Sequence, residues 1–276
     1  MIKLGQYNLL KVVKKVNFGL YLDGDQHGEI LLPAKYADKS TAPGDEIEVF
    51  VYLDSDDRII ATTLKPKACV GECAYLKVVQ TNRIGAFLDW GLPKDLLVPF
   101  SEQQKPLQKG YSYAVYIYLD EASQRIAASS RLENYLSSDG GAFKANQAVE
   151  LMIYAKSDLG FKAIVNGTHL GQLYENEVFR KLHYGERLPG YIRQIRADGR
   201  IDLSLYRAAH LARGQLADEI LAHLKANDGV SSLTDKSPPQ DIYDTFGVSK
   251  AVYKKALGLL YKNRQIKIEK DRLTLL

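Results

Sequence analysis

The segment Phe18-Gly19-Leu20-Tyr21-Leu22-Asp23 recurs 66 residues further along the chain as Ile84-Gly85-Ala86-Phe87-Leu88-Asp89. The residues upstream repeat at the same offset, because Leu10-Lys11-Val12-Val13 returns as Leu76-Lys77-Val78-Val79. The offset also relates three further pairs: Pro33 and Pro99, Gly44 and Gly110, and Asp54 and Asp120. Agreement at so many spaced positions indicates two copies of one structural unit.

A third, more diverged copy begins near Ala145. Two glycines stand 25 residues apart in every copy: Gly19 and Gly44, Gly85 and Gly110, Gly160 and Gly185. Every copy also ends in a similar segment, which begins at Arg58, Arg125 and Arg200 respectively. The chain therefore contains three successive units of about 65 residues.

Each unit carries the pattern of β-strands rather than helices. Ile47, Val49, Val51 and Leu53 alternate with Glu46, Glu48, Phe50 and Tyr52, which predicts a strand with one face toward a core. Residues 111–118 occupy the equivalent strand of the second unit. Five or so strands and no room for a substantial helix favour a small closed barrel of the OB type.

The periodicity becomes helical after Arg207. Leu216, Ile220, Leu221 and Leu224 recur at helical spacing, and Asn227-Asp228-Gly229 ends that helix. A second helix is expected from Pro239 to Gly247, and a third from a cap at Ser249 to about Asn263. Short strands at 266–269 and 273–276 complete the order of a winged helix. The fold class is mainly β, with three tandem OB barrels followed by an α/β winged-helix domain.

The expected domain boundaries are 1–66, 67–136, 145–208 and 213–276. Hydrophobic residues make up 46% of the 276 residues and charged residues 25%, as in ordinary soluble protein. We expect a cytoplasmic protein that does not contact a membrane, because the sequence has no apolar run of about 18 residues and no signal-peptide h-region. The sequence does not give the oligomeric state, and a monomer is favoured. The two cysteines, Cys69 and Cys73, are expected to stay reduced and structural, and no metal or other cofactor is expected.

The net charge of +4 is unevenly distributed. Counting Lys and Arg against Asp and Glu gives −2 for residues 1–66, +1 for 67–136, +2 for 137–208 and +3 for 209–276. An anionic partner is therefore expected mainly in the C-terminal half.

Phe18 and Tyr21 place two aromatic rings three residues apart around a glycine. Such rings either pack inward or form a platform on which unpaired bases stack. The repeat resembles the S1 domain, an RNA-binding OB barrel in which two aromatics flank the glycine and an Asp and an Arg follow the next long strand. In the first copy the resemblance implies Phe18, Tyr21, Asp54 and Arg58 as the binding residues.

The later copies depart from this pattern. The resemblance implies Phe87, Asp120 and Arg125 in the second copy, with Ile84 in place of the first aromatic. The third copy has Leu159 and Lys162 at the aromatic positions, Arg196 at the Asp position, and Arg200. The usual His of the family is replaced by Pro33, Pro99 and about Tyr174. Binding in the C-terminal half is therefore expected to depend on charge more than on stacking.

Basic residues gather in two places in that half. Barrel closure is expected to bring Lys162 close to Arg187, Arg193, Arg196 and Arg200, although an ordinary solvated surface explains them as well. In the last domain eight cations lie on the third helix and the wing, the usual nucleic-acid contacts of winged helices: Lys250, Lys254, Lys255, Lys262, Arg264, Lys267, Lys270 and Arg272.

Over its full length the chain resembles the conserved virulence factor B (CvfB) family of bacterial RNA-binding proteins, most specifically through residues 190–205. The resemblance implies a non-catalytic protein that binds single-stranded RNA in post-transcriptional regulation. A regulator that binds duplex DNA through its winged helix stays open, as does a scaffold on ribosomes or RNA-degradation machinery. An enzyme is not expected, because no catalytic motif is found in the sequence.

Overall fold

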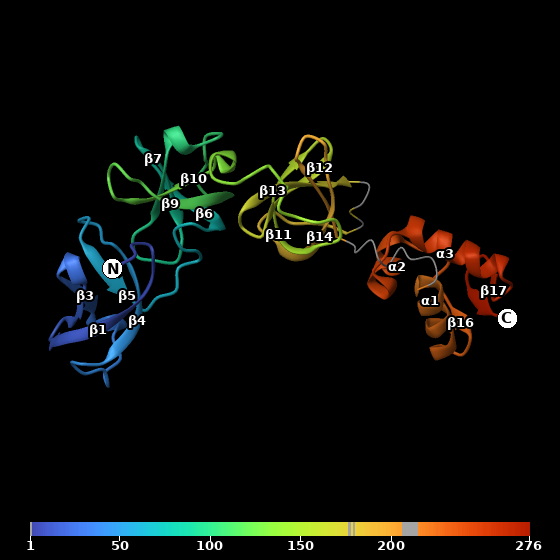
Figure 1. Cartoon of the computed structure of the whole chain (residues 1–276), viewed down its shortest axis with the longest axis horizontal. Coiled ribbons are helices and arrows are strands. Elements are labelled where there is room, and N and C mark those ends of the chain that lie inside the picture. Colours follow the sequence, from blue (N-terminus) through green and yellow to red (C-terminus); the bar gives the residue numbers. More distant parts are fainter. Residues whose placement is uncertain (1, 176–177, 179, 206–214) are drawn as a thin grey trace. The chain divides into compact units, whose positions relative to one another are not determined.

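The computed structural model describes residues 2–175, 178, 180–205 and 215–276. It contains three closed five-stranded barrels followed by a small domain of helices and short strands (Figure 1). The predicted fold class is therefore confirmed. Two of the expected domain boundaries, 208 and 213, lie outside the described residues.

All three barrels have the same strand order, in which the third and fifth strands are parallel neighbours. The first barrel comprises β1 (Gln6–Val16), β2 (Gly19–Asp23), β3 (Glu29–Pro33), β4 (Glu46–Leu53) and β5 (Ile59–Thr62). The second comprises β6 (Cys73–Thr81), β7 (Gly85–Asp89), β8 (Leu96–Pro99), β9 (Ser112–Leu119) and β10 (Ile126–Ser129). The third comprises β11 (Ala148–Ser157), β12 (Gly160–Val165), β13 (His169–Tyr174), β14 (Arg187–Ile195) and β15 (Ile201–Ser204). Closure leaves no unpaired edge strand within a barrel.

Short 3₁₀ turns complete the first two barrels: η1 (Asp25–His27), η2 (Ala34–Tyr36), η3 (Phe100–Glu102) and η4 (Leu132–Asn134). Residues just before β11 also pack on the third barrel. The ring of Phe143 lies against its core, and the Gly140 amide donates to the Gly199 carbonyl at 2.8 Å. The packing of this barrel therefore extends upstream of residue 145.

The C-terminal domain has the expected winged-helix order. Its elements are α1 (Gln215–Ala226), β16 (Val230–Ser231), α2 (Pro239–Phe246), α3 (Lys250–Lys262), β17 (Ile266–Ile268) and β18 (Leu273–Leu275). Gly247 ends α2 with left-handed backbone, and the Ser249 hydroxyl caps α3 by accepting from the Val252 amide. Tyr253, Leu257 and Leu260 of α3 are buried in the core of this domain.

The chain divides into two compact units, the first ending at Tyr135 and the second beginning at Leu136. Within the first unit the two barrels share a core. Phe50 and Tyr52 on the outer face of β4 are buried, and the Phe50 ring meets Trp90 of the second barrel edge-on at 5.8 Å between centroids.

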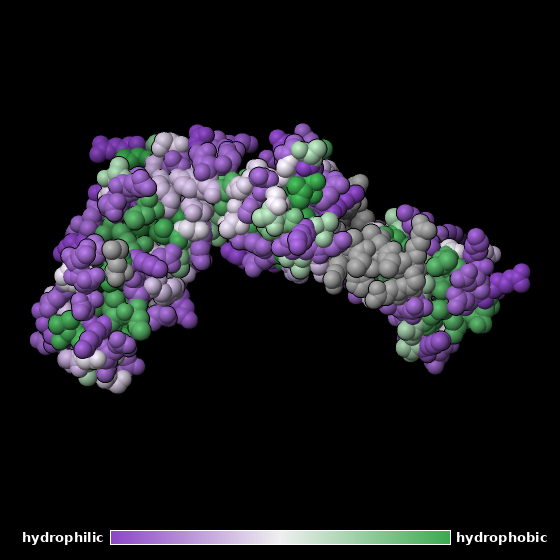
Figure 2. Space-filling model, in the orientation of Figure 1, coloured by the Kyte–Doolittle hydropathy of each residue, from purple (hydrophilic) through white to green (hydrophobic). Residues whose placement is uncertain are grey.

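The sequence pattern predicted a strand at β4 with one buried face, and in this respect the prediction was wrong. Both faces are buried from Val49 to Tyr52, because the second barrel covers Phe50 and Tyr52 on the side that alternation assigns to solvent. Glu46 and Glu48 on that side are exposed, as alternation predicts. Other apolar residues do reach the surface of the first barrel (Figure 2), among them Leu9, Val13 and Phe18. In the described ranges no helix has the length and apolar character needed to span a bilayer.

Candidate nucleic-acid interface

The first barrel presents the two aromatic rings singled out in the sequence. Phe18 lies in the turn before β2 and is 58% exposed, while Tyr21 lies on β2 and is half-buried. The ring centroids are 6.1 Å apart at an angle of 84°. The Lys14 ammonium lies 4.6 Å from the centre of the Tyr21 ring. Neither ring belongs to the core of the first barrel.

Tyr21 belongs to a row of paired residues that runs across three neighbouring strands of the barrel, β2, β3 and β5. It pairs with Leu31 of β3, which pairs with Ile60 of β5. The same row in the second barrel is Phe87, Leu97 and Ala127. In the third barrel it is Lys162, Gln172 and Asp202. The row is apolar or aromatic in the first two barrels and polar in the third.

Arg58 is exposed in the turn between β4 and β5 and is held by two carboxylates. Its guanidinium lies 2.9 Å from Asp54 and 2.8 Å from Asp56. Burial acts to raise the pKa of Asp54, but hydrogen bonds from the backbone amides of Arg58 and Asp56 and from the Arg58 side chain outweigh it, so the pKa is lowered. The two carboxylates offset the positive charge of Arg58, which weakens the attraction that Arg58 can exert on a phosphate.

Arg125 has a different environment from the one its repeat position suggested. Its guanidinium forms an ion pair with Asp57 of the first barrel, and the Lys94 ammonium lies 2.9 Å from the same carboxylate. Lys94 also donates to the Asp54 carbonyl at 2.6 Å. The structure therefore places Arg125 at the junction of the two barrels.

In the third barrel a buried carboxylate organises the residues that the sequence marked as basic. Asp202 is 3% exposed at its side chain and accepts from Arg196 Nε at 2.7 Å and from Gln194 Nε2 at 2.7 Å. The Tyr174 hydroxyl donates to it at 3.2 Å, and Arg196 in turn contacts that hydroxyl. Arg196 thus serves an internal network, whereas Lys162, Arg193 and Arg200 are exposed.

The prediction that Arg187 lies close to Arg196 was wrong. Arg187 begins β14, nine residues before Arg196, and the length of an extended strand separates the two. It forms an ion pair with Glu150 at 2.8 Å.

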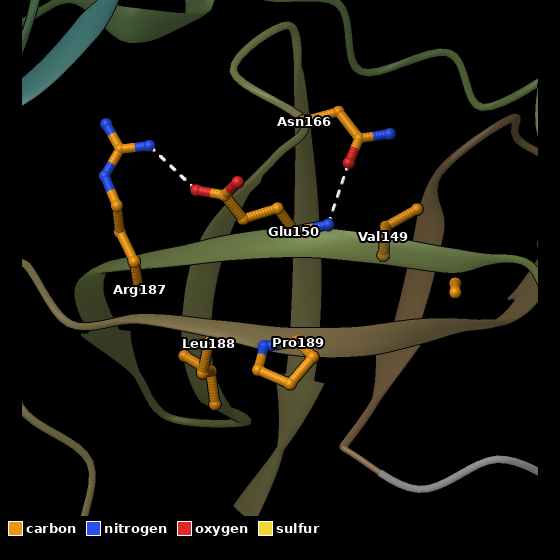
Figure 3. A pocket seen from close by; sticks show the side chains of 7 residues that line it. Val149, Glu150, Asn166, Arg187, Leu188 and Pro189 are labelled. Atoms are coloured by element: carbon orange, nitrogen blue, oxygen red, sulfur yellow. Dashed lines mark hydrogen bonds and ion pairs between the residues drawn. The ribbon is translucent and has the colours of Figure 1, made fainter.

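Arg187 and Glu150 instead border an open groove of about 540 Å³ on the outside of the barrel (Figure 3). The Asn166 side chain accepts from the Glu150 amide at 2.8 Å, and Pro189 forms part of the opposite wall. The groove is shallow, and its two charges neutralise each other.

The cations of the winged-helix domain fall into two groups. Several are engaged: Lys250 donates to the Ser237 carbonyl at 2.8 Å, Lys254 lies 3.7 Å from Asp235, Lys267 lies 2.7 Å from Glu269, and Arg272 pairs with Glu269 and Asp271. Of the eight cations marked in the sequence, the other four are exposed and make no ion pair in the described structure: Lys255, Lys262, Arg264 and Lys270. Their charges are therefore not shared with acidic side chains of the described chain.

Sequence reasoning overlooked Phe100, which directly follows β8 in η3 and is 56% exposed. Tyr111 is 63% exposed, but it precedes β9, a strand that pairs with neither β7 nor β8, and it is not part of the candidate interface. The repeat itself gave a signal for Phe100, because it follows Pro99, the counterpart of Pro33. Among the described residues no group of three His, Cys, Asp or Glu side chains could hold a metal ion, and neither Cys69 nor Cys73 forms a disulfide.

Comparison with known protein families identifies the domain types. The S1 domain model matches residues 4–64 and 70–130, which are the first two barrels. The CvfB-like winged helix domain model matches residues 218–275. The third barrel lies between the matched ranges and shares the strand order of the other two.

Several bacterial proteins are similar to this chain over most of their own length. YitL of Bacillus subtilis strain 168, named as an uncharacterized protein, is 29% identical over 95% of this chain and 90% of its own length. Conserved virulence factor B of Staphylococcus saprophyticus and of Staphylococcus aureus strain MRSA252 are each 28% identical over 84% of this chain and 80% of their length. A solved multidomain protein with nucleic acid binding domains from Streptococcus pneumoniae TIGR4 is 24% identical, covers 99% of this chain and 98% of that one, and has a TM-score of 0.45.

Proposed function

Since this chain belongs to the bacterial proteins that join S1 domains to a CvfB-like winged helix domain, we propose that it binds single-stranded RNA and regulates gene expression after transcription. Both domain types bind nucleic acids. We further propose that the protein acts as a cytoplasmic monomer and binds RNA without catalysing a reaction on it.

The ring pair formed by the exposed Phe18 and the half-buried Tyr21 is the observation that carries the proposal. A base can stack on an aromatic face only when that base is free of a partner strand, and each stacked base contributes about 1–3 kcal/mol. Bases inside an RNA duplex offer only their edges. The rings therefore favour an unpaired strand over a duplex.

The C-terminal half supports the same function through charge. Residues 137–276 carry a net charge of +5, and Lys255, Lys262, Arg264 and Lys270 are exposed without ion pairs within the described structure. Cations on the third helix and wing of a winged helix are placed to neutralise phosphates. We propose that Lys162, Arg193 and Arg200 extend this contact to the third barrel.

A competition experiment tests the proposal. A labelled single-stranded RNA is bound to the full chain and displaced by the unlabelled strand, by the same sequence as RNA duplex, or by duplex DNA. The unlabelled strand should displace it at far lower concentration than either duplex. Equal displacement by duplex RNA would refute the proposal.

A second candidate is a regulator that binds duplex DNA. It is favoured by one observation, the exposed Lys255 and Lys262 on α3, the helix that enters the major groove in many winged-helix proteins. Preferential displacement by duplex DNA in the same experiment would establish it instead.

A further inference from the structure

The second barrel lacks an aromatic ring at the position of Phe18. Ile84 stands there and is 50% exposed. The remaining ring, Phe87, is half-buried at the position of Tyr21. With one ring in place of two, the S1 pattern is incomplete at this barrel.

Strand pairing brings a second residue beside this position in every barrel. Gly19 pairs with Pro33, and the next residue, Ala34, donates its amide to the Phe18 carbonyl at 2.9 Å. The third barrel repeats the geometry, because the Glu175 amide donates to the Leu159 carbonyl at 3.0 Å. In the second barrel Gly85 pairs with Pro99, and by this register Phe100 is the counterpart of Ala34 and lies opposite Ile84.

A glycine makes this close approach possible. A Cβ atom on Gly85 would lie 2.2 Å from the Val98 carbonyl oxygen, and one on Gly19 would lie 2.2 Å from the Leu32 carbonyl oxygen. Only glycine allows the strands to approach this closely. The register therefore places Phe18 opposite Ala34 and Ile84 opposite Phe100.

The first two barrels each have one aromatic residue at this pair of positions. In the first barrel it precedes the second strand, and in the second barrel it follows the third strand. In the first barrel the pair is Phe18 and Ala34, and in the second it is Ile84 and Phe100. The exposure of the two rings is nearly the same, 58% for Phe18 and 56% for Phe100. Phe100 belongs to no core cluster of the described residues, so packing does not account for its exposed ring.

We propose that Phe100 is a base-stacking residue of the second barrel and replaces the ring that is missing at Ile84. With Phe87 it gives this barrel two rings for an unpaired strand. The Arg131 side chain donates from Nε to the Ser101 carbonyl at 2.8 Å, which fixes a guanidinium one residue from Phe100. A cation there can meet the phosphate beside a stacked base. The inference rests on the proposed binding of single-stranded RNA.

The test compares full-length variants for binding of labelled oligouridine and oligoadenine. Phe100→Ala should weaken binding by about fivefold to a hundredfold, the loss expected for one stacked base. The loss should persist at raised salt, because stacking is not screened as phosphate contacts are. Tyr111→Ala removes an equally exposed ring from the same barrel, away from β7 and β8, and should bind like wild type.

A relocation variant separates stacking from a structural role. Ile84→Phe combined with Phe100→Ala moves the ring to the side that it occupies in the first barrel, and it should restore most of the lost affinity. The proposal is overturned if Phe100→Ala binds like wild type while Phe18→Ala with Tyr21→Ala is impaired. It also falls if the relocation variant binds no better than Phe100→Ala and both are folded by circular dichroism. Wild-type protein that binds neither oligonucleotide would instead refute the proposed function.

Discussion

The guanidinium of Arg125 in the second barrel forms an ion pair with the carboxylate of Asp57 in the first. Lys94, also from the second barrel, lies 2.9 Å from the same carboxylate. One acidic side chain in the turn between β4 and β5 thus receives two cations from its neighbour. The Trp90 indole, which packs against Phe50 in the shared core, donates to the Lys94 carbonyl at 2.7 Å. The ion pairs and the apolar core therefore join the same two barrels.

Replacing Asp57 with Asn should therefore weaken the coupling between the first two barrels. Differential scanning calorimetry should show a lower Tm, or separation of one transition into two. Asp56→Asn is the matched control, since Asp56 is an exposed acid of the same turn that pairs only with Arg58 in the described structure. Equal effects of the two variants would contradict the role given to Asp57.

The same ion pairs predict a dependence on acid. The hydrogen bond from Lys94 is the largest cause of a pKa of Asp57 below its ordinary 3.8, followed by the charges of Lys94 and Arg125. A lowered pKa in the folded state adds stability above the unfolded value and loses it as pH falls through the folded value. Wild type and Asp57→Asn should differ in Tm at neutral pH and converge below about pH 4. A difference that stays constant down to pH 2 would contradict this explanation.

Arg196 and Arg200 should respond differently to substitution, although both were expected to bind RNA. Arg196→Ala leaves the buried carboxylate of Asp202 without its cation, and loss of one partner from a buried pair costs about 3–5 kcal/mol. Arg200 is 70% exposed at its side chain, so Arg200→Ala should leave stability unchanged and lower RNA affinity. Urea unfolding and filter binding on both variants provide the comparison. A stable Arg196→Ala variant would show that Gln194 and Tyr174 suffice to hold Asp202.

The exposed lysines of α3 should contribute through phosphate contacts. Lys255→Ala combined with Lys262→Ala removes two cations that make no ion pair in the described structure, and each contact to a single strand adds about 0.7 to the slope of log affinity against log salt. The double variant should therefore have a slope smaller by about 1.4 and lose affinity evenly across sequences. Lys225→Ala, at the exposed end of α1, is the control and should keep the wild-type slope. An unchanged slope in the folded double variant would exclude α3 from the RNA contact.

Charge also predicts which half of the chain binds more tightly. A fragment of residues 136–276, which corresponds to the second compact unit, should retain most of the affinity at low salt, because its net charge is +5 against −1 for residues 1–136. Fluorescence anisotropy of both fragments with one labelled RNA measures this directly. Tighter binding by the N-terminal fragment would make stacking, rather than charge, the dominant contribution.

Features encoded locally were predictable from the sequence. The repeat around Gly19 and Gly85 predicted barrels of one design, and Gly247 with Ser249 predicted the end of α2 and the start of α3. These signals depend on neighbouring residues and on backbone conformation. They required no knowledge of tertiary contacts.

Features that depend on contacts between distant segments were not predictable. The outer face of β4 is buried at Phe50 and Tyr52 because a second barrel covers these residues, and no periodicity within β4 indicates this. The pairing of Arg125 with Asp57 joins residues 68 positions apart. A count of basic residues treats Arg196 and Arg200 alike, although only the first lies against a buried carboxylate.

The shared core of Phe50, Tyr52 and Trp90 has a further consequence for an RNA strand. Because it holds the first two barrels together, the separation between Phe18 and Phe87 is fixed. Under the proposed function, a strand held at one barrel meets the other as an intramolecular partner, provided that it is long enough to reach. Oligonucleotides below that length bind with the affinity of a single barrel, and those above it gain avidity. If the chain binds single-stranded RNA as proposed, the joined barrels select strands by length as well as by their unpaired state.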